Sequence, residues 1–354
     1  MNASEGHLRL PRNLAELTAE WLSAALATRY PGVEVTSVHV GTVSHGTNTR
    51  ARLMLTYNEA GHAHRLPPTM WAKCGFEVHT PQVAECNRSE VVFYSQRASE
   101  GLLNSARCYL ARSEESSGSS FLLLEDLLAR NVTFGFPEVR PIDPEIARRA
   151  LAMLARYHAR WWNSAGPVKQ VSSANGEIVT DMFFSKSNFE DCTHLPRFEY
   201  VPPPLRSRER FLGAIYKLWD SNLQGPRCIV HGDPDLGNSF FELDGTPGFL
   251  DVQGDTLGCW AHDFTEFVIT ALDIDARRNF ERPLLEFYLE QLRSHGVDAP
   301  TFGKAWLQYR RNTLWMSTAA VLPVAFRPES VCTAYTRRTM AAVMDLDALG
   351  SFDE

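Results

Sequence analysis

The chain has 354 residues, which is room for about two domains at roughly 100–200 residues each. Its 44% hydrophobic and 22% charged residues are typical of a globular protein and exclude a disordered or fibrous chain. A formal net charge of -7 supplies no basic field for binding nucleic acid. Without an apolar run of membrane-spanning length or the apolar segment of a signal peptide, the sequence predicts a cytoplasmic protein.

The seven cysteines are scattered singly along the chain. Their number is odd and no CxxC pair occurs, which argues against a disulfide framework and against a zinc knuckle. We expect small, buried apolar residues at Cys74, Cys86, Cys108, Cys192, Cys228, Cys259 and Cys332.

The first third of the chain carries strand patterns together with two helices. Residues 13–30 repeat apolar side chains at helical spacing, and residues 81–101 form a second predicted helix. β-Branched residues, alternation and apolar runs predict strands at 33–42, 47–57, 69–76 and 121–128. We expect a small β-rich N-lobe over residues 1–120, with residues 121–128 also serving as the interlobe linker.

From about residue 143 the pattern is chiefly helical. Apolar periodicity predicts two helices near the C-terminus and further helices at 143–162, 206–223, 262–273 and 282–296. Residues 165–203 are predicted to form an irregular insert. Residues 129–354 therefore form a large, mainly helical C-lobe, and the chain as a whole is predicted to have an α+β fold of two lobes.

One polar segment interrupts the helical region. The sequence HGDPDLGN, His231–Asn238, lies between the apolar run CIV and the strand-like GFLDVQ. Phosphoryl transfer from ATP needs a carboxylate that accepts the proton of a hydroxyl, and oxygen ligands that hold Mg²⁺ against the phosphates. Asp233 is the candidate base, and Asn238 and Asp251 are candidate ligands of the kind that Mg²⁺ takes. The alternative is a hairpin turn of Gly, Pro, Asp and Asn without chemistry.

These motifs resemble those of the aminoglycoside phosphotransferase and choline kinase superfamily, in which HGDxxxxN is followed by a strand of the form hhDhE or hhDhQ. With its upstream segment LARYHARWW and the GFLDVQ strand, the sequence is most similar to the ecdysteroid-kinase-like branch. The resemblance implies a bilobal protein-kinase-like fold, Asp233 as the catalytic aspartate, and Asn238 and Asp251 as Mg²⁺ ligands. Asp235 stands where many members have His or Trp, and its role is left open.

A lysine and a glutamate in the predicted N-lobe fit the same interpretation. Lys73 lies in an otherwise apolar strand, as does the kinase lysine that contacts the α- and β-phosphates. Glu90 falls on the apolar face of its predicted helix, and a buried carboxylate needs a partner. We expect an ion pair between them. The alternatives are an edge-strand lysine in solvent and a glutamate at the margin of the apolar face.

Two further segments would complete the ATP site of such a kinase. GTVSHGTN lies between two strands and could turn backbone N–H groups toward phosphate at Ser44, His45, Gly46, Thr47 and Asn48. The resemblance places the adenine-binding linker at Glu125, Asp126 and Leu127.

Three residues near the motif are expected to support it. Asp263 is placed to N-cap the helix that follows, and an acidic residue there also steadies the catalytic loop in the resembled family. His158 lies on the apolar face of its helix, as a core histidine would. We expect His231 to order the loop through hydrogen bonds.

The sequence thus predicts a phosphotransferase that uses ATP and Mg²⁺ and acts on a hydroxyl of a small molecule. Residues 181–200 are rich in aromatics and carry mixed charges, which favours a partly apolar alcohol of steroid or hydroxyacyl type. An aminoglycoside or a choline-type acceptor is the alternative.

Two other classes of protein stay open. A metal phosphohydrolase would use His158, His231, His262 and Asp263, but such a site wants its ligands on helices and would leave Lys73 and Glu90 without a purpose. A non-catalytic nucleotide-binding module usually lacks a catalytic residue, and none is missing here.

Overall fold

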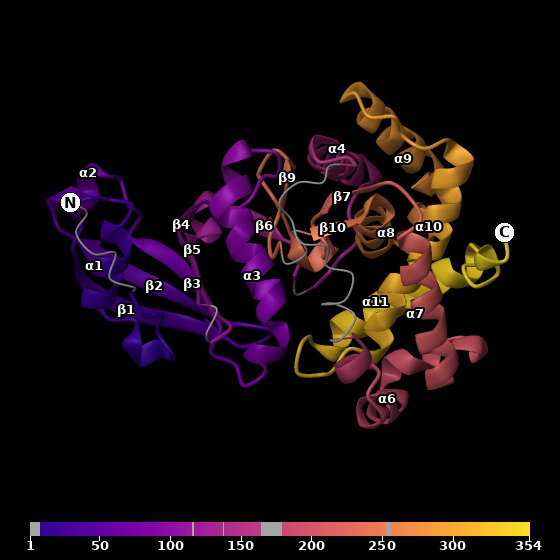
Figure 1. The fold of residues 1–354 in the computed structure, drawn as a ribbon, viewed down its shortest axis with the longest axis horizontal. Helices are drawn as coiled ribbons and strands as arrows, with labels where there is room; N and C mark the ends of the chain where they lie inside the picture. Colours follow the sequence, from indigo (N-terminus) through magenta and orange to yellow (C-terminus); the bar gives the residue numbers. More distant parts are fainter. Residues whose placement is uncertain (1–7, 115–116, 137, 164–178, 253–255) are drawn as a thin grey trace. The chain divides into compact units, whose positions relative to one another are not determined.

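The structure, a computed structural model, describes residues 8–114, 117–136, 138–163, 179–252 and 256–354. These residues form two compact units, whose elements are drawn in Figure 1. The first unit runs up to Glu100 and includes Ala106–Asn131, and the second consists of Gly101–Ser105 and Val132–Glu354. Gln253 of the GFLDVQ motif and the first part of the predicted insert, residues 165–178, lie outside the described residues.

A five-stranded antiparallel sheet with the order β1-β2-β3-β5-β4 forms the first unit. Its strands are β1 (Val35–Ser44), β2 (Thr49–Tyr57), β3 (Thr69–Cys74), β4 (Cys108–Glu114) and β5 (Ser119–Glu125). Alternation along β2 directs Ala51, Leu53 and Leu55 into a core shared with α1 (Ala19–Ala27). The antiparallel β-rich unit predicted for the first third of the chain is therefore present.

Helix α3 (Ala84–Val92) packs on β4 and β5. A 3-10 turn over Thr80–Val83, with proline near its start, leads into this helix, and a π-helical turn over Phe93–Arg97 continues it. The single helix predicted at 81–101 is thus a series of helical pieces. A short helix, α2 (Glu59–Ala63), connects β2 to β3.

Residues 121–128, predicted as a strand and as a linker, begin inside the first unit. Most of them belong to β5, which pairs with β3 on one side and β4 on the other. A 3-10 turn over Leu127–Arg130, N-capped by Asp126, follows the strand. The first unit therefore continues to Asn131, because the apolar run is an interior strand buried in the sheet.

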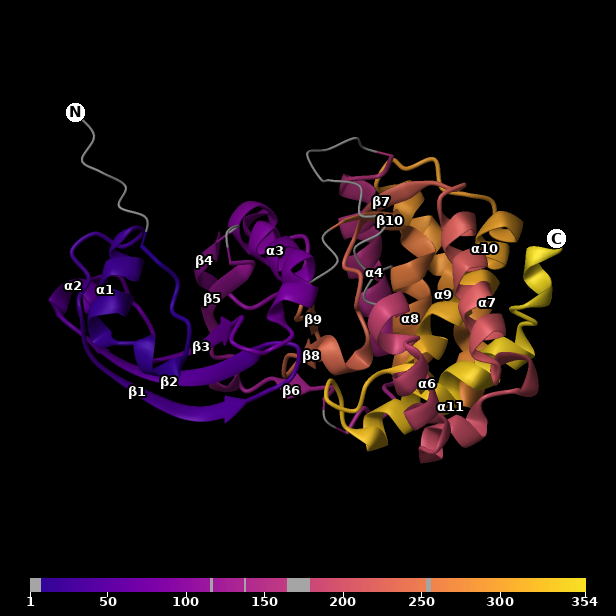
Figure 2. The same cartoon turned by 60° about the horizontal axis from the view of Figure 1, so that its bottom comes forward.

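The second unit is mainly helical. Its helices are α4 (Pro144–Arg160), α6 (Lys186–Thr193), α7 (Arg208–Asn222), α8 (Trp260–Ala271), α9 (Ile274–Ser294), α10 (Phe302–Met316) and α11 (Glu329–Asp345). Helix α8 is buried along nearly its whole length and is surrounded by α4, α9, α10 and α11 (Figure 2). This central helix presents one of its turns to the polar segment.

Two short sheets hold the polar segment in place. Strand β7 (Arg227–Val230) pairs with β10 (Thr256–Cys259), and β6 (Thr133–Phe134), β8 (Ser239–Phe241) and β9 (Pro247–Phe249) form a second sheet. Ser239 faces Phe249 in the β8–β9 hairpin. The residue that precedes β8 therefore lies beside the residues that follow β9.

The described part of the insert is helical, so the prediction of an irregular segment was wrong there. A π-helical turn over Val179–Phe183 is followed by α6 and by a 3-10 turn over Pro196–Tyr200. Phe184, Phe189 and Phe198 pack into the core that includes α7. Tertiary packing of these rings overrides the weak local helix preference of the segment.

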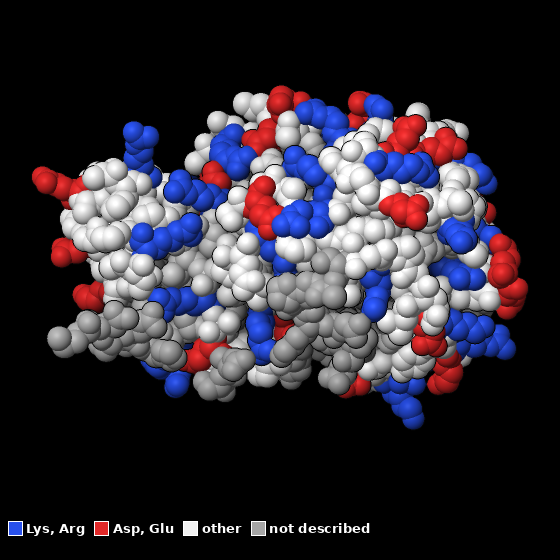
Figure 3. Space-filling view, turned by 45° about the horizontal axis from the view of Figure 1, so that its top comes forward, with Lys and Arg blue, Asp and Glu red and all other residues white. Residues whose placement is uncertain are grey.

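All seven cysteines are buried and free, as expected. Among the described residues, no helix combines the length and apolar character needed to cross a lipid bilayer. On the face drawn in Figure 3, Lys and Arg are interspersed with Asp and Glu over both units. The described residues of that face therefore form no continuous basic stripe of the kind that follows a nucleic-acid backbone.

Candidate active site

The HGDPDLGN segment leaves the sheet at the end of β7 and turns at Gly232, whose φ is +85°. This backbone conformation is open to glycine and strained for other residues. The N–H groups of His231 and Gly232 donate to the carboxylate of Asp263, at 2.6 Å and 2.9 Å. The Gly232 carbonyl accepts from His262 Nε2 at 3.0 Å. Helix α8 therefore holds the first half of the loop.

Asp263 is fully buried in the first turn of α8 and binds the loop rather than capping the helix. The prediction that it is an N-cap was wrong, because α8 already begins at Trp260. His158 Nε2 donates to Asp263 Oδ2 at 2.9 Å, and His158 Nδ1 lies 2.5 Å from the Tyr288 hydroxyl. Burial acts to raise the pKa of Asp263, but the hydrogen bond and charge of His158 outweigh it and lower that pKa. Asp263 is thus an ionised anchor, and His158 is the core histidine that was predicted.

His231 orders the loop as predicted. Its ring is fully buried, and Nδ1 accepts the backbone N–H of Asp233 at 3.3 Å. Burial lowers the pKa of His231 more than the surrounding carboxylates raise it. A neutral ring that accepts this hydrogen bond fixes the backbone of the candidate base.

The three candidate residues of this unit come together at the β8–β9 hairpin. A 3-10 turn over Leu236–Asn238 leads into β8, and the Leu250 N–H donates to the Asn238 carbonyl at 2.8 Å. This contact brings Asp251, with φ +59°, beside Asn238. Asn238 Nδ2 donates to the Asp233 carbonyl at 2.9 Å and to Asp233 Oδ2 at 2.8 Å. The hairpin thus brings together the carboxylate of the candidate base and the side-chain oxygens of the two candidate metal ligands.

The donors at this hairpin fit Mg²⁺. Because Asn238 Nδ2 is directed to Asp233, Asn238 Oδ1 faces away from that contact, and no donor to Oδ1 is found within the described residues. Asp251 is half-buried and contributes a carboxylate. Mg²⁺ in phosphate-transferring sites takes one or two protein oxygens and fills its remaining positions with phosphate and water.

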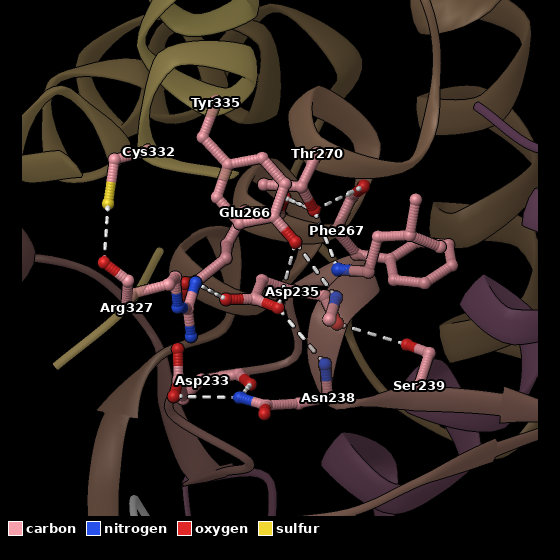
Figure 4. Close-up of polar contacts among 12 residues, drawn as sticks. Asp233, Asp235, Asn238, Ser239, Glu266, Phe267, Thr270, Arg327, Cys332 and Tyr335 are labelled. Carbon is pink, nitrogen blue, oxygen red and sulfur yellow. Dashed lines mark hydrogen bonds and ion pairs between the residues drawn. The ribbon is translucent and has the colours of Figure 1, made fainter. Parts of the chain in front are cut away.

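Asp235 is fully buried and joins the loop to α11 (Figure 4). Its Oδ1 accepts the Asn238 N–H at 3.0 Å and the Tyr335 hydroxyl at 3.1 Å, and its Oδ2 forms an ion pair with Arg327. The Tyr335 hydroxyl accepts the Gly237 N–H at 2.8 Å. The guanidinium of Arg327 lies 5.5 Å from the centre of the Tyr335 ring. Both oxygens of Asp235 are therefore satisfied from within the protein.

Carboxyl oxygens of Asp233, Asp235 and Glu266 lie within 4.8 Å of one another. Burial, followed by the charges of the neighbouring acids, raises the pKa of both Asp233 and Glu266 well above the ordinary range. The charge of Arg327 opposes this increase. Glu266 also lies 3.2 Å from His262 Nε2. The close approach of these acids therefore favours proton uptake by Asp233 and Glu266.

The histidines do not form a metal site in the part of the chain that the structure describes. The candidate ligand group of three found there is the acidic one, without histidine. Asp263 and Tyr288 engage both ring nitrogens of His158, and Gly232 and Glu266 engage His262 Nε2. The phosphohydrolase alternative thus lacks a shared ligand site.

In the first unit, the expected ion pair is present, with 2.6 Å between Lys73 Nζ and Glu90 Oε2. Strand β3 lies between β2 and β5, so Lys73 is in the interior of the sheet and not at its edge. The two side chains are only 10% and 2% exposed. A buried pair of this kind depends on both partners, because a single buried charge is costly.

The β1–β2 hairpin contains the proposed phosphate-binding segment. Ser44 ends β1, and residues 45–48 form the turn. Glu77 Oε1 accepts from the Thr49 hydroxyl at 2.6 Å and lies 2.8 Å from His45 Nδ1. At Gly46 a side chain would meet no atom within 4 Å, so the tip of the turn is open. Phosphate binding by Ser44, His45, Gly46, Thr47 and Asn48 stays a prediction.

An amide pair ties this turn to α3. Asn48 Nδ2 donates to Asn87 Oδ1 at 2.8 Å, and both side chains are buried. Asn87 precedes Glu90 by three positions, which places the two on neighbouring parts of one helix surface. Helix α3 therefore holds both the turn and Lys73.

The proposed adenine-binding residues follow β5. Asp126 is buried and accepts from Arg52 Nε at 2.8 Å and from Trp71 Nε1 at 3.1 Å. Its carboxylate is therefore structural. Adenine binding by the backbone of Glu125, Asp126 and Leu127 stays a prediction.

Four residues that contact the candidate site residues were not predicted from the sequence. Asn87 binds Asn48 in the first unit, and Glu266, Arg327 and Tyr335 lie around Asp235 in the second. Arg327 and Tyr335 lie 92 and 100 positions from Asp235, so no local spacing connects them to the motif. Glu266 follows His262 at the i+4 spacing of a helix surface, and that spacing is a signal for a pair.

Comparison with known proteins gives one family match. A family model described as the phosphotransferase enzyme family (APH) matches residues 76–306, which is more than half of the chain. Among curated proteins, none matches the sequence.

Three similar solved structures are small-molecule kinases or phosphotransferases. The microcompartment-associated aminopropanol kinase is 12% identical, with a TM-score of 0.49 and coverage of 93% of this chain and 97% of that one. Choline kinase LicA from Streptococcus pneumoniae is 13% identical, with a TM-score of 0.48 and coverage of 93% and 98%. APH(3'')-Id from Streptomyces rimosus, in complex with ADP and streptomycin, is 15% identical, with a TM-score of 0.42 and coverage of 81% and 90%.

Proposed function

This chain belongs to the phosphotransferase enzyme family, and we propose that it transfers the γ-phosphate of ATP to a hydroxyl group of a small molecule. The observation that carries the proposal is the assembly of Asp233, Asn238 and Asp251 at one hairpin. Membership of the ecdysteroid-kinase-like branch stays a prediction that rests on the segment LARYHARWW and the GFLDVQ strand.

Asp233 acts as the base. As the acceptor oxygen bonds to the γ-phosphorus, the bond from that phosphorus to the β–γ bridging oxygen breaks and the hydroxyl proton passes to the Asp233 carboxylate. Asn238 Nδ2 donates a hydrogen bond to Oδ2 of this carboxylate, and the His231 ring accepts the backbone N–H of Asp233. The raised pKa of Asp233 favours proton uptake by its carboxylate.

Asn238 Oδ1 and the Asp251 carboxylate are the ligands that would hold Mg²⁺. The bound ion would neutralise charge on the ATP phosphates. Asn238 has two tasks in this arrangement, because its Nδ2 positions the base while its Oδ1 is available to the ion.

The first unit contributes to ATP binding through Lys73. Glu90 fixes the ammonium group at 2.6 Å, and Asn48 and Asn87 fix the adjacent turn. Positioned donors of this kind bind phosphate oxygens without reorganisation.

The acceptor is proposed to be a small, partly apolar alcohol. Most aromatics of residues 181–200 are core residues, but Phe183 is half-buried and packs against half-buried Phe326, with 6.3 Å between the ring centres. Phe326 precedes Arg327, which reaches Asp235 in the loop. An apolar surface thus lies close in the chain to the residues around the base.

The proposal is tested first by separating turnover from nucleotide binding. Asp233→Ala should abolish phosphate transfer and leave MgATP affinity within about threefold of the wild type, because the base acts on the acceptor. Calorimetric titration with MgATP and detection of ADP give the two quantities. Near-normal turnover in this variant would falsify the role of Asp233.

The metal role of Asp251 predicts the opposite pattern. Asp251→Ala should lose MgATP affinity by about tenfold or more, since one of two protein ligands is removed. Asp244→Ala is the matched control, because Asp244 is exposed in the turn of the same hairpin. Equal MgATP affinity in the two variants would remove Asp251 from the metal site.

A further inference from the structure

Arg327 is a cation beside the proposed base, and the mechanism above gives it no role. It lies in the turn that precedes α11, where it pairs with Asp235 Oδ2 and rests on the ring of Tyr335. The charges of Asp235 and Asp233 both act on its guanidinium. Carboxyl oxygens of these two acids lie within 4.8 Å of each other, so the guanidinium and the base belong to one cluster.

The guanidinium has donors to spare. An arginine carries five N–H donors, and the hydrogen bond of this one to a protein acceptor, within the described residues, is the bond from Nη1 to Asp235. The Arg327 side chain is 21% exposed, whereas that of Asp235 is 1% exposed. Arg327 is therefore held by Asp235 and the Tyr335 ring, and its side chain is partly exposed to solvent.

The two acids of the cluster other than the base, Asp235 and Glu266, are both buried. Asp235 accepts from Asn238, Tyr335 and Arg327. Glu266 is 2% exposed, lies 3.2 Å from His262 Nε2, and has a raised pKa that keeps it protonated more readily than an ordinary glutamate. Neither carboxyl group offers a free, exposed charge to an ammonium group. The accessible charge of this cluster, apart from the base, is the positive one on Arg327.

We propose that Arg327 binds an anionic group of the acceptor, and that the substrate is therefore a hydroxyl compound that also carries a carboxylate. This inference deepens the proposed function and rests on it. A guanidinium binds a carboxylate through parallel N–H groups in a planar fork, a geometry that ammonium groups lack. The phosphate transfer itself is unchanged, and its product is the phosphate ester of a hydroxy acid.

The same arrangement selects against cationic acceptors. An ammonium group beside Arg327 would meet a like charge, and the Asp235 carboxylate next to that charge is already paired. The half-buried Phe183 and Phe326 pair suits a short hydrocarbon segment between the hydroxyl and the carboxylate. The acceptor thus combines a hydroxyl for Asp233, an apolar stem and an anionic end for Arg327.

The test uses linear alcohols of three to five carbons that differ in one end group: a carboxylate, a second hydroxyl or an ammonium. ADP formation with MgATP gives kcat/KM for each compound in the wild type and in Arg327→Gln. We expect the carboxylates to have the highest kcat/KM and to lose about tenfold or more in the variant, while the diols change by less than about threefold.

Three further variants control for charge and for folding. Arg337→Gln removes an exposed arginine from α11 and should leave the order of the three end groups unchanged. Asp235→Asn with Arg327→Gln removes both charges of the ion pair, so no lone buried charge remains, and it should show the same loss for carboxylates. Arg327→Lys keeps the charge without the fork and should recover only part of the activity.

A preference of the wild type for the ammonium alcohols would overturn the proposal. An equal loss for all three end groups in both Arg327→Gln and the double variant would also overturn it, because that is the effect of a structural residue. If the carboxylates neither react nor bind while the enzyme binds MgATP and phosphorylates another alcohol, the anionic acceptor is wrong and the proposed function stands. If MgATP does not bind to the wild type, the proposed function itself fails.

Discussion

Replacing Asp263 with asparagine tests how the HGDPDLGN loop is held. The Asp263 carboxylate accepts three hydrogen bonds, from the N–H groups of His231 and Gly232 and from His158 Nε2. The asparagine has one carbonyl oxygen and one NH₂ group in the same space. If the oxygen takes the place of Oδ2, two donors keep an acceptor and the Gly232 N–H faces another donor.

The cost follows from these contacts. One buried donor left without an acceptor costs about 1–3 kcal/mol, and each of the two remaining hydrogen bonds loses roughly 1 kcal/mol when its acceptor is no longer charged. We expect Asp263→Asn to lower the free energy of unfolding by about 3–5 kcal/mol at pH 7. Phosphate transfer should fall more than MgATP affinity, because the change displaces Asp233.

The effect should depend on pH with a definite sign. Folding lowers the pKa of Asp263, so its ionised form stabilises the fold above the unfolded value of about 4. This contribution is lost as the pH falls through the lower, folded pKa. The difference in unfolding free energy between wild type and variant should therefore be largest near pH 7 and shrink below about pH 4.

Urea unfolding followed by circular dichroism at pH 7, 5 and 3.5 measures this difference. Asp275→Asn is the matched control, because that side chain is 87% exposed and should change the unfolding free energy by less than about 0.5 kcal/mol. If Asp263→Asn behaves like this control, or if its cost is the same at all three pH values, the carboxylate is not the anchor described above.

Two predictions concern the first unit, and both use urea unfolding. Glu90→Leu should lower the free energy of unfolding by about 3–5 kcal/mol and weaken MgATP binding, because it leaves Lys73 as a lone buried charge. Adding Lys73→Met to this variant should restore the stability but not the MgATP binding. Recovery of both in the double variant would mean that the ion pair is purely structural. Asn48→Ala and Asn87→Ala should each cost about 1–3 kcal/mol, with a coupling above about 0.5 kcal/mol in the double variant. Additive costs would show that the two amides act independently.

The sequence predicted those parts of the site whose geometry is local. Asp233, Asn238 and Asp251 are close in sequence, and one hairpin brings them together through the Leu250 contact to Asn238. Lys73 and Glu90 could be paired from periodicity, because a strand and a helix each give a buried direction to their side chains. Their roles in binding and catalysis remain predictions.

What the sequence could not predict depends on long-range packing. Arg327 and Tyr335 reach Asp235 only because α11 packs near α8, and no local pattern records that contact. Capping, a local effect, was the wrong prediction for Asp263, whereas its contact with loop N–H groups 31 and 32 positions away was expected only from the family resemblance. The aromatic residues of the insert were ambiguous for the same reason, because the same residue types occur in the protein core and in ligand-binding sites.

The most direct test of the central claim is to look for the phosphorylated product. Phosphorus NMR can follow wild-type protein with MgATP and a set of hydroxy acids, diols, amino alcohols, aminoglycosides and sterols. The account predicts ADP together with a new phosphate monoester in the wild type, and no ester with Asp233→Ala under the same conditions. An ester formed at the same rate by this variant, or a wild type that consumes ATP and releases only inorganic phosphate with every alcohol, would contradict it.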